Sequence, residues 1–178
     1  DLAAKSLELR AWAHGENPAA TALLNAAGFV PVRELLRLTL DPSRLAEEIE
    51  RSRPLPENFE VLSFEPANSA QADDWVRVNA SAFASHPEQG AVTRADFDSL
   101  VQEPWFNAED LRLAYALTPN SARNLAGFTW VKTVREGDFT ETELYVLGVD
   151  PAFAGIGLGA ALLGETLRRM QLHDPARI

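Results

Sequence analysis

The stretch ELYVLGVDPAFAGIGLGAALLGETLRR, from Glu143 to Arg169, decides the fold of this chain. It begins with a nearly continuous apolar run, Leu144 to Val149, which predicts a central strand covered on both faces. Asp150 and Pro151 end that strand, and three glycines follow. Apolar residues then recur at helical spacing, at Leu158, Ala161, Leu162, Leu167 and Met170. The stretch therefore predicts a strand, a glycine-rich loop and an amphipathic helix.

The glycine-rich loop predicts an anion site made from backbone N–H groups. Gly155, Gly157 and Gly159 occupy alternate positions, where side chains would keep a ligand away from the backbone. The positive end of the following helix dipole lies behind the same spot. A nucleotide P-loop is excluded, because Ala160 and Ala161 stand where that loop requires Lys and Ser or Thr. A dinucleotide loop is disfavoured, because that fingerprint opens the first βαβ unit and this loop comes late in the chain.

Composition narrows the classes of function. A length of 178 residues predicts one ordinary domain, or one and a piece. The net charge of −10 disfavours nucleic-acid and anionic-membrane partners. The absence of cysteine excludes thiol catalysis and thiolate metal sites, and the widely spaced His14, His86 and His173 predict no other metal site. We expect a cytoplasmic protein with neither a signal peptide nor a membrane-spanning run.

Two pieces of folded chain flank a charged stretch. Residues 43–56 are mostly charged and then contain prolines, which predicts a linker; a surface helix inside one domain is the alternative. The elements expected before it are a strand at Ser6–Trp12, a helix at Ala19–Ala27 capped by Asn17, and extended chain at Phe29–Leu40.

The elements expected after the charged stretch follow the order β, α, α, β, β, β, glycine loop, α. The turn-rich Thr118–Asn124 is expected to join the second and third of these strands as an antiparallel pair. The expected ranges are strands at Phe59–Phe64, Leu111–Leu117, Leu125–Val134 and Leu144–Val149, and helices at Ala70–Ala84, from Thr93, and after the loop.

The loop resembles the acyl-coenzyme A loop of the GCN5-related N-acetyltransferases, which reads Gln/Arg-x-x-Gly-x-Gly/Ala between a strand and a helix. Residues 154–159, AGIGLG, match it except at Ala154, where the family has Gln or Arg. That difference removes one side-chain donor and none of the backbone donors. The element order is also the opening order of that fold. The resemblance implies an α/β (α+β) fold with a central mixed sheet flanked by helices.

Longer segments are similar to the mycothiol synthase family, which joins two such folds in tandem. The resemblance implies that residues 1–42 are the C-terminal part of a first acetyltransferase domain. Residues 43–56 would be a linker, and residues 57–178 a second domain lacking its last elements. The similar segments are HGENPAATALLNAAGFVPVRELLRL (14–38), NASAFASHPEQG (79–90), AGFTWVK (126–132), ELYVLGVDP (143–151) and GLGAALL (157–163).

The resemblance also implies an activity and its partners. The family transfers an acetyl group from acetyl-CoA to the cysteine amine of cysteinyl-glucosaminyl-inositol, which gives mycothiol. We therefore expect acetyl-CoA as co-substrate, no metal, a small-molecule amine acceptor, no nucleic-acid or membrane partner, and a monomer for the full-length protein. The backbone at the strand end is expected to receive the acetyl and pantetheine groups, and the loop the pyrophosphate. These cofactor-binding residues are Leu147, Gly148, Val149, Ala154, Gly155, Ile156, Gly157, Leu158, Gly159 and Ala160.

Glu143 is the expected general base, because an ammonium must lose a proton before its nitrogen can attack a thioester. Strand alternation would put Glu143 on one face with Tyr145, Leu147 and Val149. Glu143 would then lie about 13 Å from Leu147 at about 3.3 Å per residue, so that a bulge or a water relay is needed. Glu88 and Lys132 match positions that the family uses to bind the acceptor, whose polar groups they could hydrogen-bond.

One catalytic group has no counterpart in this sequence. The resemblance implies a general-acid tyrosine in a helix beyond Ile178, and the equivalent position in the first segment is Leu24. Tyr115 and Tyr145 are the only tyrosines, and both are expected in the core. Two alternatives stay open: an acetyltransferase with another amine acceptor, and a non-catalytic acyl-CoA-binding module.

Overall fold

The structure, a computed structural model, describes residues 9–86, 89–117 and 123–178. The chain divides into two compact units, Asp1–Leu38 and Thr39–Ile178. In the first unit, the described residues form helix α1 (Pro18–Ala26), and none of them is buried. Asn17 caps α1 as predicted, since its side chain accepts a hydrogen bond from the Ala20 amide. The strand predicted at Ser6–Trp12 is wrong for residues 9–12, which are irregular, and residues 6–8 lie outside the described chain.

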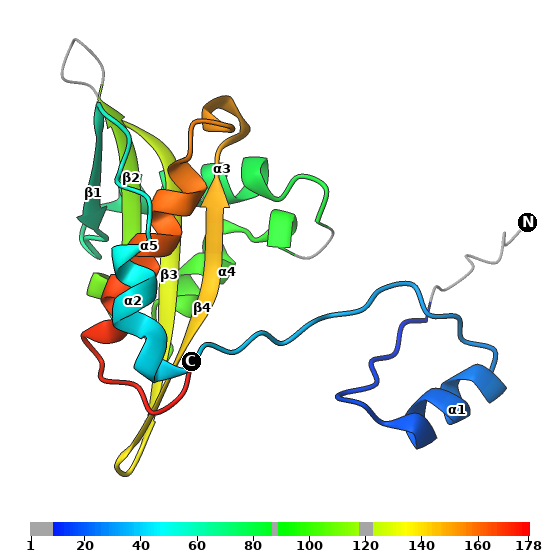
Figure 1. The fold of residues 1–178 in the computed structure, drawn as a ribbon. Helices are drawn as coiled ribbons and strands as arrows, with labels where there is room; N and C mark the ends of the chain where they lie inside the picture. Colours follow the sequence, from blue (N-terminus) through cyan, green and yellow to red (C-terminus); the bar gives the residue numbers. More distant parts are fainter. Residues whose placement is uncertain (1–8, 87–88, 118–122) are drawn as a thin grey trace, which may run out of the picture. The chain divides into compact units, whose positions relative to one another are not determined.

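The second unit is an antiparallel sheet with helices on both faces (Figure 1). Its strand order is β1-β2-β3-β4, and the element order predicted from Phe59 onward is confirmed. The strands are β1 (Phe59–Ser63), β2 (Leu111–Leu117), β3 (Arg123–Glu136) and β4 (Phe139–Val149). The α-helices are α2 (Leu45–Glu50), α3 (Ser69–Ala82), α4 (Arg94–Leu100) and α5 (Leu158–Gln171). Short 3₁₀ turns are η1 (Pro42–Arg44), η2 (Gln89–Ala91), η3 (Ala108–Asp110) and η4 (Pro151–Phe153).

The strands β3 and β4 are longer than predicted because they continue as the two arms of a hairpin. Gly137 turns the chain between them with a φ of 59°, a conformation that glycine adopts without steric cost. The arms are mostly polar, so they lack the apolar residues that predict a strand from sequence. All four strands pair antiparallel, and the parallel pairing found in the described residues is an isolated bridge between Glu141 and Arg177.

Alternate residues of β3 build the two halves of the core. Phe128 and Trp130 point to the face covered by α3 and α4, where they meet Trp75 and Phe97. Their neighbours in β3 point to the opposite face, where Val131 packs with Leu45 and Met170 under α2 and α5. All four aromatic side chains are fully buried, and burial of such rings contributes much of the stability of a domain.

The stretch predicted as a linker contributes α2 to the second unit, where α2 lies along α5 (Figure 1). Just after α2, Ser52 approaches Gly164 of α5 so closely that a Cβ at Gly164 would lie 2.6 Å from the Ser52 side chain. The Ser52 hydroxyl also accepts a hydrogen bond of 2.9 Å from Arg168. The chain ahead of β1 is therefore fastened along α5.

A buried carboxylate anchors the other end of α5. Asp110, 1% exposed at the start of β2, accepts hydrogen bonds from Arg169 at 2.7 Å and 3.1 Å. His173 lies 2.9 Å from the same oxygen, and its second ring nitrogen lies 3.1 Å from the Arg135 guanidinium. An arginine donates there, so the ring accepts at Nδ1 and donates from Nε2 to Asp110. These contacts hold the C-terminal end of α5 against the sheet, at the end of the helix remote from the glycine loop.

Candidate functional site

The end of β4 offers backbone groups to a ligand. β4 is an edge strand of the described sheet, so one of its sides is not paired with a strand. The Asp150 amide donates a hydrogen bond to the Ala126 carbonyl of β3, and this bond shows which residues of β4 are hydrogen-bonded to β3. Alternate residues of an antiparallel pair bond to the partner, so Gly148 faces β3 while Leu147 and Val149 direct their N–H and C=O groups to the open side.

The glycine-rich loop links this strand end to α5. Asp150 caps η4 by accepting from the Ala152 amide, and Gly155 and Gly157 then take φ values of 81° and 90°. These left-handed conformations explain two of the three glycines, because a side chain there would be strained. Gly157 is the N-cap of α5 and supplies no side-chain cap, and the first turn of α5 holds no acidic residue.

The predicted loop residues divide into two kinds. Leu158 is buried against Leu162, so its side chain belongs to the core and only its N–H is offered to a ligand. Ile156 is half exposed, and Ala154 and Ala160 are exposed. The free N–H groups of the first turn of α5 carry its partial positive charge, so the loop and the helix together favour an anion.

Glu143 and Lys132 lie opposite each other on β4 and β3. The Lys132 Nζ is 3.3 Å from Glu143 Oε1, and the Glu143 side chain is 53% exposed. The structure thus brings the predicted base together with one predicted acceptor ligand. The other, Glu88, lies outside the described residues.

A β-bulge changes the face on which Glu143 lies. Trp130 pairs with Val146 and Val131 pairs with Leu144, so Tyr145 is an extra residue in β4. The predicted alternation of Glu143, Tyr145, Leu147 and Val149 on one face is therefore wrong. Leu147 and Val149 pack toward α5, whereas Glu143 lies with Lys132 on the face covered by α3 and α4. A bulge was one of the two expectations for Glu143, and the pairing places it at Tyr145.

Two aromatic residues complete the surroundings of Lys132. Its Nζ lies 5.4 Å from the centre of the Trp105 ring and 5.9 Å from that of Tyr145, within the range of cation–π attraction. Tyr145 is 38% exposed, so the prediction of a core residue is wrong for it, while Tyr115 is buried as predicted. Burial raises the pKa of Tyr145; the Lys132 cation opposes that shift and the Glu143 carboxylate adds to it.

The described residues just after Glu88 are held against α3 and its C-terminal end. The Asn79 side chain, fully buried in α3, donates to the Gln89 carbonyl at 2.7 Å and accepts from the Gln89 side chain at 2.9 Å. Gly90 lies so near the chain of α3 that a Cβ there would be 2.3 Å from the Phe83 carbonyl oxygen. Asn79 and Gly90 thus fix where the chain re-enters the described structure after Glu88.

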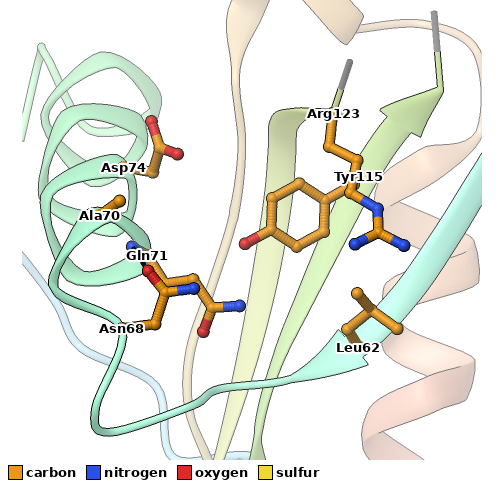
Figure 2. Close-up of a pocket in the computed structure, with 7 residues that line it drawn as sticks. All are labelled: Leu62, Asn68, Ala70, Gln71, Asp74, Tyr115 and Arg123. Carbon is orange, nitrogen blue, oxygen red and sulfur yellow. Dashed lines mark hydrogen bonds between the residues drawn. The ribbon is translucent and has the colours of Figure 1, made fainter. Parts of the chain in front are cut away.

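A separate hollow of about 180 Å³ lies between α3 and the sheet, away from β4 (Figure 2). Figure 2 shows Tyr115 and Arg123 on the strand side and Asp74 on the helix side. None of the predicted site residues lines it. The described residues also contain no cluster of side chains that could hold a metal ion. No helix in the described part of the chain has the length and apolar character needed to cross a membrane.

Curated relatives match nearly the whole chain. It is 46% identical over 156 residues to a mycothiol acetyltransferase of Clavibacter michiganensis subsp. michiganensis, which covers 88% of this chain and 47% of the relative. It is 40% identical over 168 residues to the mycothiol acetyltransferase of Sanguibacter keddieii, covering 92% and 51%. The chain thus spans about half the length of the curated relatives it matches. No protein-family model matches it.

Solved structures agree on the fold. Saccharomyces cerevisiae N-myristoyltransferase with bound myristoyl-CoA and inhibitors gives a TM-score of 0.56 at 17% identity, over 80% of this chain and 34% of that chain. A NatC complex bound to Gag peptide and CoA gives 0.51 at 16% identity, over 66% and 70%. The chain is therefore similar to mycothiol acetyltransferases over most of its own length and about half of theirs, and its second unit shares the fold of these two solved structures.

Proposed function

We propose that the second unit binds acetyl-CoA and acetylates the cysteine amine of cysteinyl-glucosaminyl-inositol to give mycothiol. The proposal is supported by an open strand edge, a glycine-rich loop at the end of that strand and a carboxylate on the same strand, in a chain whose curated relatives are named mycothiol acetyltransferases. Those names favour acetyl transfer over a non-catalytic module. In this proposal residues 57–178 belong to the second of two tandem domains.

The co-substrate lies along the end of β4 in this proposal. The outward N–H and C=O groups of Leu147 and Val149 bind the acetyl and pantetheine groups in the manner of a further strand. The N–H groups of residues 154–160 bind the pyrophosphate at the positive end of α5. The two solved neighbours, which hold CoA or myristoyl-CoA, support an acyl-CoA as the co-substrate.

Glu143 takes the proton from the acceptor ammonium, directly or through one water. The freed amine attacks the thioester carbonyl, a C–N bond forms, the C–S bond breaks, and CoA leaves as a thiolate that takes up a proton. Lys132 holds the Glu143 carboxylate and offers a donor to the acceptor. Trp105 and Tyr145 fix Lys132 from the side and give the acceptor an apolar wall.

Turnover of the chain with acetyl-CoA and the cysteinyl pseudodisaccharide tests this function. The acceptor itself carries a thiol, so the acetylated product is measured by mass spectrometry rather than by thiol release. Glu143→Gln is expected to lower the rate about 10²- to 10⁴-fold with unchanged acetyl-CoA affinity. Glu141→Gln, two residues away and paired with Arg177, is the matched control and should retain activity. Equal activity of both variants would remove Glu143 from the mechanism.

A further inference from the structure

Arg53 places a cation beside the glycine-rich loop. A Cβ built at Gly157 would lie 3.5 Å from an Arg53 guanidinium nitrogen and 3.9 Å from its Cδ. Arg53 comes from the segment between α2 and β1, far from the loop in sequence, and its side chain is exposed. Across the described residues, carboxylates pair with other arginines, such as Arg44, Arg51 and Arg112, and none pairs with Arg53.

This position is unfavourable for a cation in the absence of an anion. The N-terminus of a helix carries a partial positive charge, and a guanidinium beside it is repelled. Gly157 supplies no capping side chain, and no acidic residue in the first turn of α5 compensates. Two positive groups therefore converge on one spot of a chain whose net charge is −10.

Packing of the preceding residue fixes where Arg53 emerges. Ser52 fits against α5 only because Gly164 has no Cβ, and the Arg168 hydrogen bond holds its hydroxyl. Gly164 lies about two turns along α5 from Gly157, or about 10 Å at 1.5 Å per residue. Arg53 is the next residue after Ser52, and its extended side chain spans most of that distance. The contact of Arg53 with the loop therefore follows from the packing of Ser52 against α5.

We propose that Arg53 binds the pyrophosphate of the acyl-CoA co-substrate, and supplies from the segment before β1 the side-chain donor that Ala154 does not provide. This inference rests on the proposed function. A guanidinium matches phosphate oxygens with two parallel hydrogen bonds, and the helix N–H groups bind the same anion from the other side. The anion in turn neutralises the two positive groups.

Calorimetric titration of the full chain with acetyl-CoA tests the inference. Arg53→Ala is expected to weaken binding about 10- to 100-fold, the range for loss of charge-assisted hydrogen bonds. Arg53→Lys should recover part of the loss, because an ammonium retains the charge without the paired geometry. Arg51→Ala is the matched control: its side chain, two residues away, pairs with Glu47 and Glu48, and binding should change less than about twofold.

A second ligand identifies the phosphate concerned. Acetyl-3′-dephospho-CoA keeps the pyrophosphate, so Arg53→Ala should weaken its binding by the same factor as for acetyl-CoA. A loss confined to acetyl-CoA would assign Arg53 to the 3′-phosphate and overturn the inference. If the unchanged chain binds acetyl-CoA and Arg53→Ala binds equally well, Arg53 has no such role while the proposed function stands. Absence of binding by the unchanged chain would overturn both.

Discussion

Substitution of Gly164 by Ala tests how the segment ahead of β1 is fastened to α5. Gly164 is buried in α5, and an added Cβ would lie 2.6 Å from both Cβ and Oγ of Ser52. Real Cβ atoms do not approach other atoms so closely. Because Ser52 Cβ is bonded directly to its backbone, the clash cannot be relieved by a side-chain rotation alone. The segment that carries Ser52 must move away from the helix.

Two opposing free-energy terms decide the outcome. Replacing glycine by alanine inside a helix stabilises it by about 1 kcal/mol. Overpacking a tight contact costs about 1–3 kcal/mol, and loss of the hydrogen bond between Arg168 and Ser52 costs about 1 kcal/mol more. We therefore expect Gly164→Ala to lower the free energy of unfolding by about 1–3 kcal/mol.

Urea unfolding followed by tryptophan fluorescence measures this change, since Trp75, Trp105 and Trp130 all lie in the second unit. Ser52→Gly removes both clashing atoms, so it should rescue most of the steric cost in the double variant. A stabilised Gly164→Ala variant, the normal result for a helix interior, would show that Ser52 does not pack against α5 in this way.

Three further predictions concern the loop and the aromatic cluster. Gly157→Ala should lower the free energy of unfolding by about 1–2 kcal/mol, because Gly157 has a left-handed φ of 90°. Gly159→Ala should lower it by less than about 0.5 kcal/mol, because the new Cβ would meet Val149 at an ordinary 3.7 Å. Equal losses in the two variants would contradict the loop geometry. In spectrophotometric titration, Glu143→Gln should lower the pKa of Tyr145 and Lys132→Met should raise it, with Tyr145→Phe identifying the signal; unchanged curves would place both charges away from the ring. The pKa of Tyr145 is raised above its ordinary value of 10.0 in the folded chain, so the neutral phenol contributes to stability below pH 10.0. This contribution is lost as the pH rises through the pKa of the folded chain. Tyr145→Phe should therefore reduce the loss of stability at alkaline pH, measured by urea unfolding.

The parts of the fold that depend on local sequence were predicted. The strand, glycine loop and helix from Glu143 onward are in place, and so is the element order from Phe59, because each element has its own periodicity and stop signals. The hairpin arms, which are the end of β3 after Val134 and the start of β4 before Leu144, were not predicted. Their polar alternation is compatible with solvent-exposed loop as well as with a two-stranded ribbon, and only the pairing itself decides between them.

The parts of the site that depend on tertiary contacts were missed. A bulge or a water relay was expected near Glu143, but the position of the bulge at Tyr145 and the face it gives to Glu143 arise from the register of β4 against β3, which sequence periodicity does not encode. Trp105, from the chain after α4, lies beside Lys132. Arg53, from the stretch predicted as a linker, lies beside the glycine-rich loop. One signal in the sequence could have pointed to Arg53. Ala154 replaces a Gln or Arg of the family, so the missing side-chain donor could have been expected from another segment.

Backbone amide hydrogen exchange, with and without saturating acetyl-CoA, is the most direct test that the end of β4 and the glycine-rich loop bind the co-substrate. We expect slower exchange at Leu147 and Val149 and through residues 154–160, with little change around the separate hollow beside Tyr115. Protection at that hollow instead, or no protection at the strand end and the loop, would contradict it.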